Sequence, residues 1–328
     1  MLITQTPLRI SFAGGGTDLE SYYRERGGAV LSSAIDKYVY VILNKRFDDK
    51  IYLSYSKKEI VDSVDDIQHE LVREAMRITG IKKGVEIAIM ADIPSSGSGL
   101  GSSSSLTVGL LNAFHTYQGV QVSAEQLTRE ACEIEITRCG KPIGKQDQYI
   151  AAYGGLNFFE FLPTGEVQVT PIRLGPVKRH WSASMLLFFT DITRSADIIL
   201  REQNAKTPEK REFLDQIKQL AYRARDAVGA GRFDEIGDIL RENWRLKKEL
   251  ASGITRPEID RMVETAMAGG ATGCKLCGAG GGGFLLTYCS RTVKSGLRKA
   301  MHHYREMPFF LERYGSKVNY NVEGYEWD

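Results

Sequence analysis

A glycine- and serine-rich segment at residues 94–104 (PSSGSGLGSSS) separates two segments of opposite hydrophobic periodicity. Before it, residues 85–93 (VEIAIMADI) alternate apolar and other side chains at a period of two, which predicts a strand. After it, Leu106, Leu110 and Phe114 recur at helical spacing, which predicts an amphipathic helix. A strand, a glycine-rich loop and a helix in this order restrict the chain to folds that combine sheets with helices.

The same loop is a candidate phosphate-binding site. It offers unpaired backbone N–H groups, and the dipole of the following helix favours an anion at that end. It lacks the lysine of the G-x-x-x-x-G-K-[ST] loop, which excludes a P-loop NTPase. Its serines are expected to cap the helix or to offer a hydroxyl to Mg²⁺. The alternative is a plain flexible linker.

Two further glycine clusters stand near the ends of the chain. The first, PLRISFAGGGTDL (7–19), presents Thr17 and Asp18 directly after three glycines. A carboxylate at such a turn suits sugar hydroxyls because it accepts two hydrogen bonds; the alternative is that Asp18 caps a helix over 19–25. The second cluster, GAGGGG (278–283), is followed by strand-like FLLTY, which excludes a dinucleotide-binding fingerprint. It is expected to pack against another loop or a phosphate.

The composition, 42% hydrophobic and 26% charged residues, is that of a globular protein with an ordinary core. The formal net charge of +2 argues against nucleic-acid or membrane-surface partners, although a local basic pocket is compatible with it. No apolar run approaches the length of a membrane span, and we expect no signal peptide. Five cysteines, an odd number at low density, favour reduced thiols and a cytoplasmic location.

The remaining periodicity predicts two α+β domains, residues 1–178 and 179–328, with a site between them. In the first, Ser123 is expected to cap a helix, and residues 156–172 read as a hairpin. In the second, strands are expected near 184–189, 271–276, 284–288 and 316–322, and helices near 213–227, 233–250, 256–268 and 292–304.

Two acidic residues, Glu135 and Asp147, lie in one helix–loop segment and are close enough in sequence to face one pocket. A carboxylate beside a phosphate loop can hold Mg²⁺ or accept a proton from an attacking hydroxyl. The alternative for each residue is a solvated surface charge.

Taken together, these motifs resemble the GHMP small-molecule kinases. The Pro-Leu-Arg start with its glycine turn, the Gly-Leu-Gly-Ser-Ser loop and the late glycine turn occur in the family's order, over essentially the whole chain. The resemblance implies an N-terminal domain like domain 2 of ribosomal protein S5, a ferredoxin-like C-terminal domain, and ATP and Mg²⁺ as cofactors. It implies an ATP-binding role for Pro94, Ser96, Gly97, Ser98, Gly99, Leu100, Gly101, Ser102 and Ser103.

The family's functional residues match particular positions of this chain. Asp147 matches the catalytic aspartate, and Arg9 matches the basic residue near the reacting oxygens. Ser103 and Glu135 match the Mg²⁺ ligands, and Asp18 matches the acid that grips sugar hydroxyls in the sugar-kinase branch. Further substrate contacts are expected from Gly15, Gly16, Thr17, Arg194, Gly280 and Gly281.

Four segments are similar to the heptose 7-phosphate kinases within this family: TPLRISFAGGGTDL, DIPSSGSGLGSSSSL, IGKQDQYIAAYGGLNFFEF and TRSA (193–196). Fucokinase-type domains share parts of this pattern. The galactokinase form of the first motif, Gly-Glu-His-Thr-Asp, keeps only its Thr-Asp end here, which disfavours galactose.

This closer resemblance implies that ATP phosphorylates the anomeric hydroxyl of D-glycero-D-manno-heptose 7-phosphate. The product would be the 1,7-bisphosphate, a precursor of nucleotide-activated heptose for lipopolysaccharide or capsule. Arg194 is expected to bind the 7-phosphate, the alternative being a surface ion pair. Other functions left open are a 1-kinase for L-fucose or another hexose, and a non-catalytic binding protein of the same fold. The joint presence of Ser103, Glu135 and Asp147 argues against loss of catalysis. The sequence gives no indication of the oligomeric state.

Overall fold

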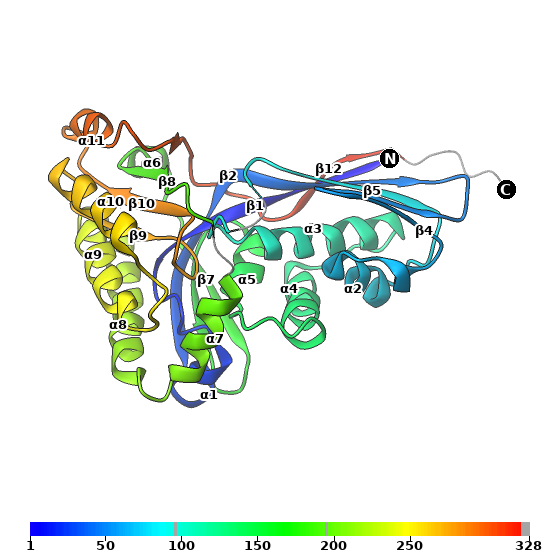
Figure 1. Cartoon of the computed structure of the whole chain (residues 1–328), viewed down its shortest axis with the longest axis horizontal. Coiled ribbons are helices and arrows are strands. Elements are labelled where there is room, and N and C mark those ends of the chain that lie inside the picture. The colour runs from blue at the N-terminus through cyan, green and yellow to red at the C-terminus, as the bar shows by residue number, and fades with distance from the viewer. Residues whose placement is uncertain (95–96, 194–195, 323–328) are drawn as a thin grey trace.

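The computed structural model describes residues 1–94, 97–193 and 196–322, and within them the strands form two sheets (Figure 1). The larger sheet contains β1 (Leu2–Ala13), β2 (Gly28–Lys45), β3 (Ile51–Ser54), β4 (Lys58–Val61), β5 (Val85–Ala91), β6 (Leu156–Phe161), β7 (Val167–Pro171) and β12 (Lys317–Asn321). The smaller sheet contains β8 (Met185–Phe189), β9 (Gly273–Leu276), β10 (Phe284–Tyr288) and β11 (Glu306–Met307).

The helices of the first part of the chain are α1 (Glu20–Arg26), the 3-10 turn η1 (Val64–Asp66), α2 (Glu70–Thr79), α3 (Ser102–Tyr117), α4 (Ala124–Cys132), the π-helix η2 (Glu133–Arg138) and α5 (Gln146–Tyr153). Those of the second part are α6 (Val177–Ser182), α7 (Ala196–Lys206), α8 (Arg211–Gly229), α9 (Glu235–Lys248), α10 (Pro257–Ala268) and α11 (Lys294–Ala300). Among the described residues, none of these helices combines the length and apolar character that crossing a bilayer requires.

Strand β2 pairs with β1, β5 and β6 and lies at the centre of the larger sheet. Its first part pairs antiparallel with β6 and its last part with β5, while β1 runs antiparallel along most of its length. The strand order is β12-β1-β2-β5-β3-β4, so the last strand of the chain hydrogen-bonds to the first. In Figure 1, β12 in red lies beside β1 in blue.

Strand β1 was not predicted from the sequence. Leu8, Ile10 and Phe12 alternate at a period of two, and all three are fully buried. The same alternation turns Arg9 and Ser11 to the opposite face, where they are also buried, at 4% and 5% exposure. The register with β2 is irregular on either side of this pair, between residues 7 and 8 and between 11 and 13. Such bulges commonly re-aim side chains beside active sites.

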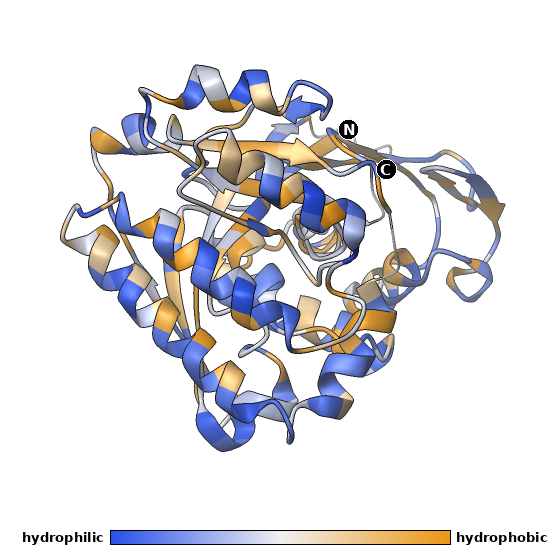
Figure 2. Ribbon diagram, turned by 60° about the vertical axis from the view of Figure 1, so that its left-hand side comes forward, coloured by the Kyte–Doolittle hydropathy of each residue, from blue (hydrophilic) through white to orange (hydrophobic). Residues whose placement is uncertain are grey.

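Helices from both parts of the chain pack on the large sheet. Helix α3 contacts β1 and β2 from the first part, and from the second part α8 contacts both strands and α9 contacts β1. The apolar core is continuous across the two sheets, and the ring of Phe12 stacks on that of Trp181 at 5.1 Å between centroids. Figure 2 shows the covering helices with hydrophobic and hydrophilic residues in alternation, as expected for helices with one buried face.

Most of the expected elements are present. The strand over 85–93, the helix after the glycine–serine loop and the hairpin over 156–172 correspond to β5, α3 and β6–β7. The Ser123 cap is confirmed, because its Oγ accepts a hydrogen bond from the N–H of Gln126 at 3.1 Å. The domain boundary near residue 178 stays a prediction; α6 lies there, and β12 from the second part joins the sheet of the first.

Candidate active site

The glycine–serine loop leads into α3 by a tight, left-handed backbone path. Gly97, Gly99 and Gly101 have φ angles of 72°, 72° and 77°, which favour glycine. A Cβ on Gly99 would lie 2.5 Å from the carbonyl oxygen of Cys277, so the loop and the late glycine turn pack backbone to backbone. Gly101 is the N-cap of α3 and has no side chain, so for the described serines the capping expectation is wrong. The first turn of α3 follows the loop directly, and the N–H groups of a helix N-terminus favour an anion.

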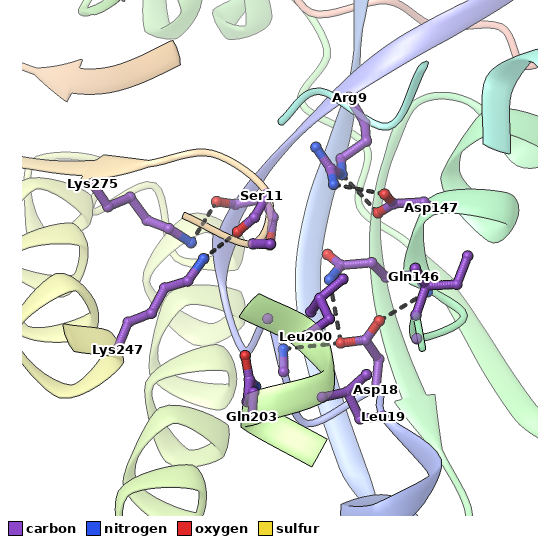
Figure 3. A pocket seen from close by; sticks show the side chains of 16 residues that line it. Arg9, Ser11, Asp18, Leu19, Gln146, Asp147, Leu200, Gln203, Lys247 and Lys275 are labelled. Carbon is purple, nitrogen blue, oxygen red and sulfur yellow. Dashed lines mark hydrogen bonds and ion pairs between the residues drawn. The ribbon is translucent and has the colours of Figure 1, made fainter. Parts of the chain in front are cut away.

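Arg9 and Asp147 form a bidentate ion pair beside this loop (Figure 3). The Arg9 Nε donates to Asp147 Oδ1 at 2.8 Å, and its Nη2 donates to Oδ2 at 2.7 Å. The Arg9 Nη1 donates to the carbonyl oxygen of Gly99 at 2.5 Å, which ties β1 to the loop. The side chain of Asp147 is 23% exposed and that of Arg9 only 5%, so the carboxylate is the more accessible partner. In this geometry the Asp147 carboxylate can accept a proton, while the Arg9 guanidinium can stabilise negative charge nearby.

The side chains of Ser103 and Glu135 contact each other at the start of α3. The Ser103 Oγ donates to Glu135 Oε1 at 2.6 Å, and Gln148 Nε2 donates to Glu135 Oε2 at 2.6 Å. Glu135 is fully buried, and burial raises its pKa to about 7, partly offset by these hydrogen bonds. It belongs to the π-helix η2, a distortion that is frequent at functional sites.

Asp18 closes the glycine turn of residues 14–16 rather than capping α1. The N-cap of α1 is Leu19, whose side chain has no hydrogen-bond acceptor, so the alternative that Asp18 caps this helix is wrong. The Asp18 carboxylate accepts hydrogen bonds from the N–H of Gly16 at 2.9 Å and from the N–H and Nε2 of Gln146 at 3.2 Å. Burial and the nearby Asp147 raise the pKa of Asp18.

Thr17 lies behind this turn and does not line the cavity. Its hydroxyl is fully buried, donates to the carbonyl oxygens of Gly14 and Ala29, and accepts from the N–H of Ala29. These bonds fix the turn that presents Asp18, so Thr17 supports the turn from behind.

A cavity between the two parts of the chain collects five of the predicted site residues. The side chains of Arg9, Asp18 and Asp147 line it together with the backbone of Gly15 and Gly16. From the second part come four residues that sequence reasoning missed, Leu200 and Gln203 of α7, Lys247 of α9 and Lys275 of β9. Gly278 and Ala279 of the late glycine turn line the cavity as well. Figure 3 shows these groups converging from both sides.

The late glycine turn contributes its first residues to the cavity and its middle residues to packing. Gly278 approaches Gly99 so closely that an added Cβ would lie 2.6 Å from the Gly99 Cα. Gly280 and Gly281 instead contact Ile254, whose carbonyl oxygen accepts from the N–H of Gly281 at 2.8 Å. The expectation that this turn packs against another loop is confirmed. Gly280 and Gly281 do not line the cavity.

Three of the predicted residues add little to this picture. Pro94 is exposed at the start of the loop. Ser96 and Arg194 lie outside the described residues, so their predicted contacts to ATP and to the substrate phosphate have no structural counterpart to report.

Both parts of the chain match the GHMP kinases. Residues 64–155 match the N-terminal domain of these kinases and residues 224–304 match their C-terminal domain. The chain belongs to the GHMP kinase family, which confirms the predicted α+β fold and an ATP-dependent kinase.

Among its relatives, a D-glycero-alpha-D-manno-heptose 7-phosphate kinase from Campylobacter jejuni is 35% identical over 320 residues, 91% of this chain and 92% of that protein. A bifunctional fucokinase/GDP-fucose pyrophosphorylase from Arabidopsis thaliana is 27% identical, over 92% of this chain and 31% of that protein. A crystal structure of a D-glycero-D-manno-heptose 1-phosphate kinase from Bacteroides thetaiotaomicron superposes with a TM-score of 0.83 at 26% identity, covering 99% of this chain and all of that one.

Proposed function

We propose that the chain transfers the γ-phosphoryl group of ATP to the anomeric hydroxyl of D-glycero-D-manno-heptose 7-phosphate, giving the 1,7-bisphosphate. The observation that carries the proposal is the Arg9–Asp147 pair, which lies at the junction of the glycine–serine loop and the cavity. The 35% identity to a heptose 7-phosphate kinase supports the choice of sugar. The bisphosphate would feed the synthesis of nucleotide-activated heptose.

In the proposed reaction, the anomeric oxygen forms a bond to the γ-phosphorus as the bond from that phosphorus to the bridging oxygen of ADP breaks. The proton of the hydroxyl passes to the Asp147 carboxylate. Because phosphoryl transfer depends mainly on positioning and charge stabilisation, the proton can leave late. An anomeric hydroxyl is more acidic than an ordinary alcohol, which favours transfer of its proton to a carboxylate. Arg9 stabilises the negative charge that gathers on the transferring oxygens.

Asp18 is proposed to accept hydrogen bonds from the sugar hydroxyls. Its carboxylate is held on one side by Gly16 and Gln146 and lines the cavity on the other. The Oε1 of Gln146 is buried without a hydrogen-bond partner among the described residues and lines the same cavity. A sugar hydroxyl would supply the missing donor.

Ser103 and Glu135 are the residues that would hold Mg²⁺. A hydroxyl and a carboxylate oxygen in mutual contact at the start of α3 are hard donors, and Mg²⁺ bound with a nucleotide needs only one or two of these from the protein. When bound, the ion would neutralise charge on the β- and γ-phosphate oxygens.

The test is an ATP-consumption assay over heptose, heptose 7-phosphate, heptose 1-phosphate, L-fucose and D-mannose, followed by anomeric ¹H and ³¹P NMR of each product. The proposal expects heptose 7-phosphate to be the preferred substrate, with a new phosphorus coupling at the anomeric proton. Preference for heptose 1-phosphate would move the reacting hydroxyl to the far end of the sugar, as the name of the Bacteroides relative suggests for that protein. Preference for L-fucose would overturn the choice of sugar in favour of the fucokinase alternative.

A further inference from the structure

Two lysines lie buried in the wall of the cavity without a carboxylate partner. Lys247, near the end of α9, is 5% exposed, and Lys275, in β9, is 2% exposed. Within the described part of the chain, neither ammonium group has a carboxylate oxygen within the 4 Å that defines an ion pair. In Figure 3 they approach from the side opposite Asp147 and Asp18. Two buried cations without counter-charges are costly, and a bound anion would remove that cost.

Both ammonium groups are held by backbone and keep donor capacity. The Lys275 Nζ donates to the carbonyl oxygen of Ser11 at 2.9 Å and to that of Phe12 at 3.4 Å. The Lys247 Nζ donates to the carbonyl oxygen of Gly278, the single acceptor found for it among the described residues. Since an ammonium group has three N–H donors, Lys247 in particular has donors left for a ligand.

Two neutral polar groups in the wall of the same cavity lack hydrogen-bond partners among the described residues. The Ser11 Oγ and the Gln203 Nε2 are buried, at residue exposures of 5% and 3%, and neither has a hydrogen-bond partner in the described structure. Both residues line the cavity, Ser11 from β1 and Gln203 from α7. Buried polar groups are nearly always satisfied in a folded protein, so an unpaired hydroxyl and an unpaired amide N–H₂ indicate a missing ligand.

We propose that Lys247, Lys275, Ser11 and Gln203 bind the phosphate monoester that the sugar substrate already carries. This inference rests on the proposed function. A monoester dianion balances the two ammonium charges, and its three terminal oxygens accept from all four donors. The expectation for Arg194 stays a prediction beside this site, because Arg194 lies outside the described residues.

The location separates this site from the phosphates of ATP. No residue of the loop at 97–103 lines the cavity, whereas Asp18, the proposed sugar-binding acid, does. Arg9 joins the loop to the cavity through its bond to the carbonyl oxygen of Gly99, and Asp147 marks the position of the reacting hydroxyl. A sugar whose anomeric end faces Asp147 therefore directs its other end toward the second part of the chain.

The test compares kcat/KM for heptose 7-phosphate and for heptose in wild type, Lys247→Met and Lys275→Met, and determines the KM for ATP in each. Methionine keeps the length of the side chain and removes the charge. We expect the wild type to prefer the phosphorylated sugar at least 100-fold, each methionine variant to reduce that ratio at least tenfold, and the KM for ATP to change less than threefold. Lys248→Met is the matched control, because Lys248 is the next residue but lies at the surface near Asp260; its ratio should equal that of wild type.

An equal loss with both sugars, together with a raised KM for ATP, would show that the lysines serve the transferred phosphoryl group and would overturn the proposal. An unchanged ratio would overturn it as well. If a methionine variant fails to fold, Ser11→Ala gives the same comparison with a smaller expected loss, about threefold in the ratio.

Inorganic phosphate without ATP separates this site from the proposed reaction. Calorimetry should detect phosphate binding to wild type and Lys248→Met, and binding at least tenfold weaker to Lys275→Met. If wild type phosphorylates no sugar phosphate but still binds phosphate through Lys275, the proposed substrate fails and the anion site stands. If wild type binds no phosphate and shows no preference between the two sugars, the anion site fails.

Discussion

Replacing Asp147 by Asn removes a charge from the ion pair with Arg9, which joins β1 to the glycine–serine loop. The effects of this replacement on catalysis and on stability can be separated. In wild type, Arg9 donates twice to the carboxylate and once to the carbonyl oxygen of Gly99. The amide of Asn keeps one acceptor oxygen, so Arg9 exchanges two bonds to a carboxylate for one bond to a neutral oxygen. With Asp147 itself 23% exposed, we expect the free energy of unfolding to fall by about 1–3 kcal/mol.

The expected effect on the reaction is larger. Loss of a general base lowers kcat by roughly 100-fold or more, which corresponds to about 2.7 kcal/mol of transition-state stabilisation. The KM for ATP should change little, because both carboxylate oxygens of Asp147 accept hydrogen bonds from Arg9. ADP release measured with a coupled assay gives kcat, and thermal unfolding of the same preparation shows that the variant is folded at the assay temperature.

The control is the Arg9→Gln variant, alone and combined with Asp147→Asn. Because the two residues act as a unit, the losses in kcat should be strongly non-additive, the double variant being little worse than Asp147→Asn. A folded Asp147→Asn enzyme with kcat within threefold of wild type would remove Asp147 from the reaction. Additive losses would separate the roles of Arg9 and Asp147.

The metal site, the loop geometry and the buried lysines give three further predictions. Ser103→Ala and Glu135→Gln should each raise the Mg²⁺ concentration for half-maximal rate several-fold; unchanged titrations in both would place the ion elsewhere. Gly99→Ala should lower the melting temperature much more than Gly119→Ala. Both glycines have φ near 72°, but an added Cβ would collide with the carbonyl oxygen of Cys277 at Gly99 and would meet nothing within 4 Å at Gly119. Equal losses would contradict the close contact at Gly99. Burial, and to a lesser extent the charge of Lys247, lowers the pKa of Lys275 from 10.5 to about 7. Between these pH values the unfolded chain binds more protons than the folded chain, so the free energy of unfolding should rise with pH there. Lys275→Met should show a shallower rise in unfolding experiments, and an identical slope would refute the pKa shift.

The elements with a regular period were accessible from the sequence, and strand β1 was not. Helix α8 and strand β5 each bury one face, so their apolar residues recur at spacings that identify the element. In β1, both faces are covered beyond Thr6, and the second face carries Arg9 and Ser11 instead of apolar residues. Polar residues that are buried for function hide the period that would otherwise reveal the strand.

The same reasoning explains which site residues were found. Asp147 and Glu135 were singled out as two carboxylates in one helix–loop segment, and the family motifs then supplied their expected roles. The two lysines had no motif. A usable signal did exist for one of them: Ile236, Leu240 and Asn243 mark the buried stripe of α9, and Lys247 continues it four residues later. For Lys275, burial depends on strand β1 passing beside β9, which local sequence does not contain.

The pairing of β12 with β1 bears on the order in which the protein can form. Residues 317–321 cover the edge of the first strand, and the N-terminal ammonium group donates to the carbonyl oxygen of Val322 at 3.0 Å. During synthesis on the ribosome, β1 therefore keeps one row of backbone groups open until residues 317–321 have emerged. The larger sheet, which contains the first strand, is completed only then. Joining Val322 to Met1 by a short linker and opening the chain at a surface turn would make a circular permutant in which β12 directly precedes β1, so that this edge closes early.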